Sequence, residues 1–233
     1  MNPSQMKFSE LLKNFVNTNT RLETLALLST CHMKNPMNIS ASALKNFLEK
    51  TETLKKLYIH CYVTKDQNDQ NEVKWNANPN MEELYFYCYR TPSALKIEFS
   101  QAMPKLTVLA LSSIDEKMLS VFCTQSFPLL ERLYLRRGYG ALNPDLQVIY
   151  NILKNCPNLK SVQLTCFDFS DPIQVGAFLH GVYKDFNAYI DILTHQENHQ
   201  FEDYLEKTDL ATFEKYKKMK ANYLDHDWPS LVD

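Results

Sequence analysis

Apolar residues recur along the chain in a pattern of three anchors, L-x-x-L-x-L. The clearest copies are MPKLTVLAL (103–111), FPLLERLYL (127–135) and CPNLKSVQL (156–164), and NPNMEELYF (78–86) is a weaker one. A proline stands two places before the first anchor in each of these copies. The second and third anchors are two residues apart, so their side chains point to the same face of a β-strand. The pattern therefore predicts a short strand after a corner that is marked by proline.

Two further copies without the proline bring the number of repeats to six. The anchors are Leu22-Leu25-Leu27, Leu54-Leu57-Ile59, Met81-Leu84-Phe86, Leu106-Leu109-Leu111, Leu130-Leu133-Leu135 and Leu159-Val162-Leu164. Successive first anchors are 24 to 32 residues apart, at or near the period of roughly 20–29 residues that is typical of leucine-rich repeats. The alternative is a chance match in a leucine-rich helical protein, but chance would not align the spacing with the prolines.

Segments with the apolar spacing of a helix precede several of these strands. They are residues 8–16, 40–50, 115–125 and 145–155. Neither the helix nor the strand buries its apolar face alone, so such units must stack on one another. We therefore predict an α/β fold, a leucine-rich repeat solenoid with a curved parallel sheet inside and helices outside. The polar run KDQNDQNEVKW (65–75) predicts a loop, in which Trp75 is a linker residue or contacts a partner.

The sequence NILKN followed directly by CPNLKSVQL (151–164) resembles the leucine-rich repeats of F-box/LRR proteins. Those repeats are similar to the ribonuclease-inhibitor-like and cysteine-containing classes, and the resemblance spans roughly residues 8–167. It implies substrate recognition in a cullin-based ubiquitin ligase, in which a separate F-box binds the adaptor Skp1. An F-box is not found in this sequence. The alternative is a free-standing leucine-rich repeat protein with a binding or inhibitory role and no ligase partner.

In a curved repeat array, the residues between the anchors point outward on the concave face. Tyrosine and arginine are enriched there, and these residue types dominate binding hot spots. The predicted partner-binding residues are Tyr58, His60, Tyr85, Tyr87, Arg132, Tyr134, Arg136 and Gln163. The alternative interpretation is that the tyrosines support one another across neighbouring strands.

The leucine pattern ends near residue 169, which predicts a repeat array over residues 1–169 and a helical C-terminal cap or tail over residues 170–233. Ser170 and Asp171 before Pro172 are a helix-start signal. Apolar residues then recur at helical steps at Phe178, Val182, Phe186, Tyr189 and Leu193. Capping the last repeat is the favoured interpretation, and binding a partner is the alternative.

Composition narrows the possible functions. The net charge of −2 gives no electrostatic case for binding nucleic acid or an anionic membrane, and only 4 glycines argue against a glycine-rich phosphate loop. Without an apolar run of about 20 residues, no membrane span is expected. The first residues lack the apolar core of a signal peptide, so we expect a cytoplasmic or nuclear protein.

Candidate chemistry is sparse. The 6 cysteines form no CxxC pair, so free, buried thiols are expected, with Cys61, Cys88 and Cys166 pointing into the core. HQENH (195–199) has two histidines one helical turn apart, but a solvated helix end is favoured over a zinc site. No nucleophile, phosphate-loop or dinucleotide motif occurs. We therefore expect a binding protein that is not an enzyme and that has neither a cofactor nor a metal.

Overall fold

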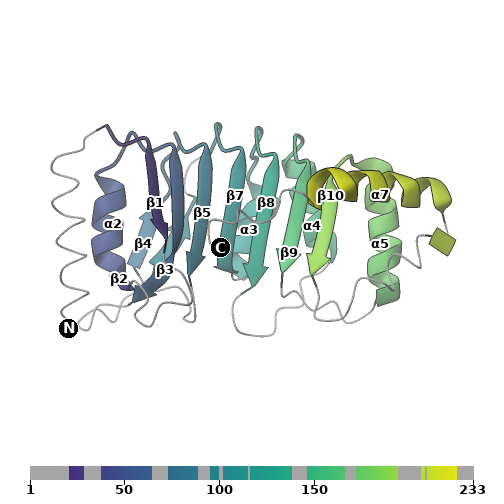
Figure 1. The fold of residues 1–233 in the computed structure, drawn as a ribbon, viewed down its shortest axis with the longest axis horizontal. Coiled ribbons are helices and arrows are strands. Elements are labelled where there is room, and N and C mark those ends of the chain that lie inside the picture. Colours follow the sequence, from purple (N-terminus) through teal and green to yellow (C-terminus); the bar gives the residue numbers. More distant parts are fainter. Residues whose placement is uncertain are drawn as a thin grey trace. The chain divides into compact units, whose positions relative to one another are not determined.

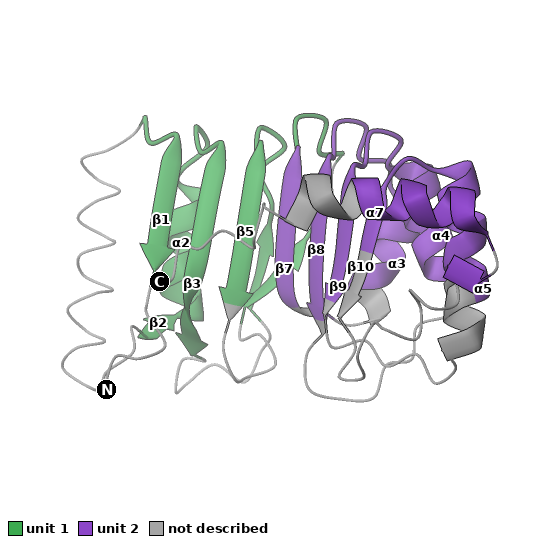
Figure 2. Ribbon diagram, turned by 45° about the vertical axis from the view of Figure 1, so that its right-hand side comes forward, with its two compact units in different colours: residues 1–106, 231–233 green, residues 107–230 purple. Residues whose placement is uncertain are grey.

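The structure is a computed structural model of all 233 residues. It describes residues 21–28, 38–64, 73–88, 95–99, 102–114, 116–137, 146–165, 172–193, 206–207 and 209–224. The chain divides into two compact units, which Figure 2 colours separately: unit 1 comprises residues 1–106 and 231–233, and unit 2 comprises residues 107–230. Each unit is of the α/β class and contains parallel strands.

Unit 1 is built on three parallel strands in the order β1-β3-β5. Its elements are β1 (Thr24–Leu28), β2 (Asn38–Ser40), α2 (Ala41–Glu49), β3 (Lys56–Thr64), β4 (Val73–Asn76), β5 (Glu83–Cys88) and β6 (Leu95–Glu98). The strands are paired so that the second anchors Leu25, Leu57 and Leu84 lie side by side. The short strand β2 pairs with the distal half of β3. The side chain of Ser40 caps the N-terminus of α2 by accepting a hydrogen bond from the backbone N–H of Ala43.

A second, two-stranded sheet in unit 1 corrects one prediction. Strands β4 and β6 pair in parallel, and the helix α2 contacts both of them. The predicted loop over residues 65–75 therefore ends in a strand, and Trp75 is only 2 % exposed, so it is neither a linker nor a partner contact. The reason is the alternation of buried Val73 and Trp75 with exposed Lys74, which is the period of a strand rather than of a loop. Residues 65–72 lie outside the described part of the chain.

Unit 2 repeats a strand-and-helix arrangement. Its elements are β7 (Val108–Ile114), α3 (Glu116–Thr124), β8 (Arg132–Arg137), α4 (Leu146–Asn155), β9 (Ser161–Thr165), α5 (Pro172–Asp185), β10 (Tyr189–Leu193) and α7 (Leu210–Leu224). The strands are parallel, in the order β7-β8-β9-β10. The helices α3 and α4 lie behind these strands in Figure 1, and α7 lies beside β10. The helical predictions for residues 40–50, 115–125 and 145–155 are confirmed, and residues 8–16 lie outside the described part.

The predicted corners are hydrogen-bonded turns. In five repeats the N–H of the first anchor donates to the carbonyl three residues earlier. The N···O distances are 3.1 Å for Leu54, 3.0 Å for Met81, 3.3 Å for Leu106, 3.2 Å for Leu130 and 3.1 Å for Leu159. In the last four of these turns proline holds the second position, where its fixed φ matches the turn. Proline therefore favours the conformation that starts each of these strands.

A second backbone motif recurs after several of the first anchors. The carbonyl directly after a first anchor accepts two N–H groups from the next strand, as the Glu23 carbonyl does from Lys55 and Lys56 at 2.8 and 3.0 Å. The Glu131 carbonyl accepts in the same way from Lys160 and Ser161. The side chains at this position form ion pairs, Lys55 with Glu23 in unit 1 and Lys160 with Glu131 in unit 2, both with an N···O distance of 2.8 Å. The same contacts thus recur within each unit at the spacing of the anchors.

The anchors form the core. All second and third anchors are buried, and Leu57, Leu84, Leu109 and Leu133 are completely inaccessible to solvent. Of the first anchors, only Leu22 is half-buried. Core formation in this protein therefore follows the apolar pattern closely.

The helix predicted from residue 172 onward is shorter than expected. Helix α5 ends at Asp185, and residues 189–193 form the strand β10. In β10, Ile190 pairs with the second anchor Val162, which places the polar residue Asn187 where a first anchor would stand. Because Asn187 is polar and no proline stands two places before it, the anchor pattern did not predict this strand. The apolar spacing through Tyr189 and Leu193 matched that of a helix instead. The predicted division of the chain at residue 169 stays a prediction.

Candidate protein-binding surface

Strands β1, β3 and β5 lie side by side in Figure 1, and their register places the outward residues of unit 1 in three rows. Each row joins residues that the strand register places side by side. The rows are Thr24-Lys56-Glu83, Ala26-Tyr58-Tyr85 and Leu28-His60-Tyr87. Parallel pairing therefore brings the predicted residues Tyr58 and Tyr85 together, and likewise His60 and Tyr87.

The middle row is held by stacking and by a shared carboxylate. The rings of Tyr58 and Tyr85 stack with centroids 4.8 Å apart and an interplanar angle of 22°. The Tyr58 hydroxyl donates to Glu83 Oε2 at 2.5 Å, and Lys56 Nζ lies 2.6 Å from Glu83 Oε1. Burial, and then the bond to Glu83, raise the pKa of Tyr58, so its hydroxyl stays a donor at every physiological pH. The cluster fixes the position of a half-buried aromatic surface.

The third row differs in accessibility. The His60 and Tyr87 rings lie 5.0 Å apart between centroids, tilted by 56°. His60 is 8 % exposed, and burial lowers its pKa, so the neutral imidazole is favoured at neutral pH. Tyr87 is half-buried. Of these two rings, Tyr87 rather than His60 can therefore offer contact area to a partner, beside the exposed Leu28 of the same row.

In unit 2 the predicted residues also lie on strands, but with different exposure. Tyr134 is 7 % exposed, Arg132 and Gln163 are half-buried, and Arg136 is exposed. Strand pairing places Gln163 beside Tyr134. Burial raises the pKa of Tyr134, while the positive charge of Arg132, and then side-chain hydrogen bonds with Ser161 and Arg132, oppose the rise. Tyr134 thus supports the packing of this face and orients Arg132, and it presents little area itself.

The structure bears on both interpretations of the tyrosines, mutual support across strands and partner binding. The stacked pair and the buried Tyr134 show mutual support between neighbouring strands, as aromatic cross-strand pairs provide. The half-buried Tyr85 and Tyr87 retain area that a partner could cover. That these residues bind a partner stays a prediction.

Free thiols are found where side chains are described. Cys61 and Cys156 are buried and Cys123 is half-buried, and all three are free. Burial raises the pKa of Cys61 to about 12 and that of Cys156 to about 11, which keeps both thiols protonated and unreactive. The side chains of Cys88 and Cys166 lie outside the described part of the chain, as does HQENH (195–199). Among described residues, no group of three or more His, Cys, Asp or Glu side chains could hold a metal ion.

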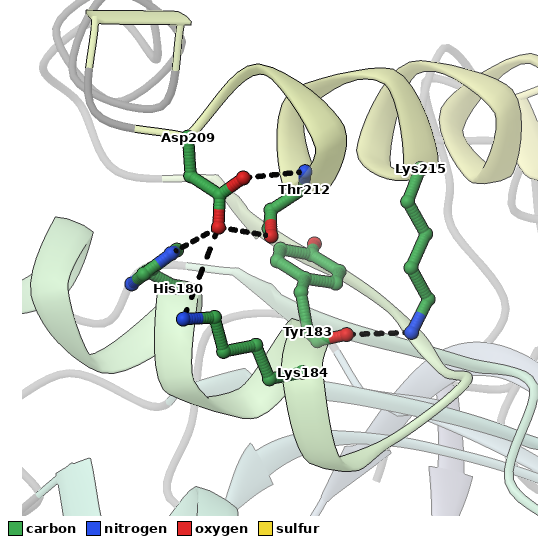
Figure 3. Close-up of polar contacts among 6 residues, drawn as sticks. All are labelled: His180, Tyr183, Lys184, Asp209, Thr212 and Lys215. Carbon is green, nitrogen blue, oxygen red and sulfur yellow. Dashed lines mark hydrogen bonds and ion pairs between the residues drawn. The ribbon is translucent and has the colours of Figure 1, made fainter.

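A polar cluster between helices α5 and α7 was missed by sequence reasoning (Figure 3). Asp209 caps α7 by accepting from the Thr212 N–H at 3.2 Å and from the Thr212 hydroxyl at 2.9 Å. On α5, the His180 ring Nε2 lies 2.8 Å from Asp209 Oδ2, and Lys184 Nζ lies 3.9 Å from the same oxygen. These hydrogen bonds, first that of His180, hold the pKa of Asp209 well below its ordinary value. The signal in the sequence was an Asp immediately before a helical segment with Thr three residues later.

Side chains between α5 and α7 also satisfy backbone groups at the C-terminus of α5 and on β10. Lys215 Nζ donates to the Tyr183 and Phe186 carbonyls at the C-terminus of α5, at 2.5 and 3.0 Å. Cations are favoured there because the last carbonyls of a helix lack intrahelical partners. The Tyr183 hydroxyl donates to the Ile190 carbonyl and accepts from the Ile190 N–H, at 3.0 and 3.2 Å, on the last strand of the sheet order. The Tyr216 ring packs edge-on against Tyr183, with centroids 5.6 Å apart.

Comparisons with protein-family models, with curated proteins and with solved structures found no match. In the described part of the chain, no helix is both long and apolar enough to cross a membrane.

Proposed function

We propose that the chain is a leucine-rich repeat solenoid that binds a protein partner on the outward face of its parallel strands. The repeated corner turns and the double hydrogen bonds to the Glu23 and Glu131 carbonyls support the solenoid interpretation, because stacked repeats make the same contact at every step. The observation that carries the function is the row of aromatic side chains on β3 and β5. Tyr58, Tyr85 and Tyr87 present half-buried rings in fixed positions.

Fixed aromatic rings suit recognition for an energetic reason. A side chain that is ordered before binding loses less conformational entropy when the partner arrives, a saving of about 0.5–1.5 kcal/mol for each side chain. In unit 1, stacking holds Tyr58 against Tyr85, and the bonds from Tyr58 and Lys56 hold Glu83. The face combines apolar area with polar tips, as protein-binding hot spots do.

The partner class follows from the resemblance in the sequence. We propose substrate recognition as in F-box/LRR subunits of ubiquitin ligases, in the cytoplasm or nucleus, with no cofactor and no catalytic step. The alternative is a free-standing binding or inhibitory protein. Binding of purified Skp1, measured by biolayer interferometry, separates the two. Affinity of this chain, or of a version extended upstream in its own gene, supports the ligase role, and the lack of it in both supports the alternative.

The binding surface is tested by a double substitution, Tyr85→Ala with Tyr87→Ala. A photo-crosslinking residue at position 87 first identifies the partner, and titration calorimetry then compares its affinity for the variants. We expect a loss of about tenfold or more, because truncating hot-spot tyrosines removes buried area and a polar contact. The matched control is Leu129→Ala with Leu210→Ala, which removes two exposed apolar side chains, 48 % and 64 % exposed, that lie off this face. Equal affinity of the tyrosine variant and the control would refute the proposal, provided that both melt at the temperature of the unaltered chain.

A further inference from the structure

The outward face of unit 2 differs in charge from that of unit 1. The outward positions of β7, β8 and β9 whose side chains are described are Val108, Ala110, Ser112, Arg132, Tyr134, Arg136, Ser161 and Gln163. Arg132 and Arg136 are the charged residues among them, and both are positive. In unit 1, by contrast, the charges of Lys56 and Glu83 cancel in a close ion pair. On β10, the outward position Asp191 pairs in register with Gln163 and carries the charge opposite to that of the arginines, so these four strands together have an excess of one positive charge, which lies on β8.

Burial decides which groups on this face a ligand can reach. Val108, Ala110, Tyr134 and Ser161 are all less than 10 % exposed. Arg136 is exposed, and Arg132 and Gln163 are half-buried. The accessible chemistry is thus two guanidinium groups and one amide, which fits an anionic ligand better than an apolar one.

The two arginines are also set at a defined separation. They lie four residues apart on one strand, and a strand rises about 3.3 Å per residue, so their Cα atoms are about 13 Å apart. An even number of steps places both on the same face. Arg132 and the buried Tyr134 lie two residues apart on the same face of β8. A pair of carboxylates four residues apart on an extended peptide has the matching separation.

We propose that the outward face of β8 binds an acidic, extended segment of the protein partner, with Arg132 and Arg136 each receiving a carboxylate and Gln163 hydrogen-bonding the peptide between them. This inference rests on the proposed function and names the chemistry of the partner. Guanidinium groups suit the role because their planar donors match a carboxylate in a two-pronged contact. Binding driven by two such pairs weakens as salt rises.

The test uses the full chain and a fluorescein-labelled peptide, Glu-Ser-Gly-Ser-Glu-Ser-Gly-Ser-Glu, whose glutamates are four residues apart. Fluorescence anisotropy at low salt measures its affinity for three proteins: the unaltered chain, Arg132→Gln with Arg136→Gln, and Arg136→Gln alone. The single variant changes an exposed side chain, so it keeps the test valid if the double variant fails to fold. The matched control is Lys154→Gln with Lys218→Gln, which removes the same charge from two exposed helical positions.

We expect about a tenfold loss of affinity in the double variant, a smaller loss in the single variant and no loss in the control. A peptide with the same composition but its three glutamates adjacent should bind less tightly, and its glutamine counterpart should not bind. Equal losses in the double variant and the control would overturn the proposal, because general charge would then explain the binding.

The C-terminal residues of the chain itself are a competing occupant. Asp225, Asp227 and Asp233 make this segment acidic. If Asp225→Asn, Asp227→Asn and Asp233→Asn together tighten peptide binding more than fivefold, the resident ligand is intramolecular and the partner proposal is overturned. An unchanged affinity supports the external partner. These peptide results do not depend on Tyr85 or Tyr87, so failure here leaves the aromatic surface of unit 1 to be judged by its own experiment.

Discussion

The two units share one way of pairing strands but differ in what connects the strands. In unit 2, the chain returns through the helices α3, α4 and α5 between successive parallel strands. In unit 1, the returns after β3 and β5 contain the strands β4 and β6, which pair with each other. The anchors and the corner turns are the same in both units. The comparison teaches that the strand and its turn define the repeat, while the return segment can change its secondary structure if it still buries apolar side chains.

The largest effect is expected from removing one large buried side chain from each kind of return segment. This tests whether the strand returns of unit 1 and the helical returns of unit 2 contribute equally to stability. Trp75 on β4 is 2 % exposed, and Phe122 on α3 is completely buried. We expect Trp75→Ala and Phe122→Ala each to lower the free energy of unfolding by about 3–5 kcal/mol, since both leave a cavity in a packed core. Urea denaturation followed by circular dichroism measures the change.

The control for this pair is Asn76→Ala, which changes an exposed side chain on the same strand as Trp75. Its effect should stay within about 0.5 kcal/mol. A loss below 1 kcal/mol in Trp75→Ala alone would show that the strand returns of unit 1 contribute less than the helical returns of unit 2.

A smaller effect is expected from a contact for which the described part of unit 1 offers no counterpart. Lys215→Met keeps much of the side-chain volume but removes the donor that binds the Tyr183 and Phe186 carbonyls. We expect a loss of about 1–3 kcal/mol, because carbonyls at a helix end lose a charged partner. Hydrogen exchange should show faster exchange in α5 and α7. Lys218→Met on an exposed position of α7 is the control, and equal exchange in both variants would contradict the role of Lys215.

The mildest test uses pH. Because hydrogen bonds from His180 and Thr212 hold the pKa of Asp209 below its ordinary value of 3.8, the folded state favours the ionised carboxylate. Its contribution to stability is therefore complete well above that value and is lost as the pH falls through 3.8 toward the lower folded pKa. Asp209→Asn should make the free energy of unfolding depend less on pH in this acidic range. Above pH 5, the variant and the unaltered chain should differ by a constant free energy. An unchanged slope in the variant would show that other carboxylates cause the acid sensitivity.

Much of the fold could be predicted from the sequence because its signals are local and periodic. The anchors, the proline corners and the helices α2, α3 and α4 each extend over a few residues with a regular spacing. The strands β4 and β6 were not predicted, because each has four residues and gains stability from a partner strand about 22 residues away. Strand β10 was hidden by the polar Asn187 at its first anchor position.

The sequence predicted which face of the strands the candidate residues point to, but it did not predict how exposed their side chains are. Alternation along a strand places Tyr58 and Tyr85 on one side of the strands of unit 1 and Tyr134 on the outward side of β8 in unit 2, and pairing within each unit follows from the common register. Exposure depends on neighbours distant in the sequence, so the burial of His60 and Tyr134 could not be derived from alternation. The contact of His180 with Asp209 joins residues 29 positions apart, beyond the reach of any local pattern.

The hydroxyl of Tyr183 has a consequence for how this protein could be lengthened. A sheet whose last strand offers free backbone groups invites another strand, from the same chain or from a neighbour. Here the N–H and the carbonyl of Ile190 are both occupied by one side chain, and α7 packs beside it. A strand added beside β10 would have to displace α7 and break both hydrogen bonds between the Tyr183 hydroxyl and Ile190. Additional units should therefore be inserted upstream of α5, so that α7 and Tyr183 continue to cover β10.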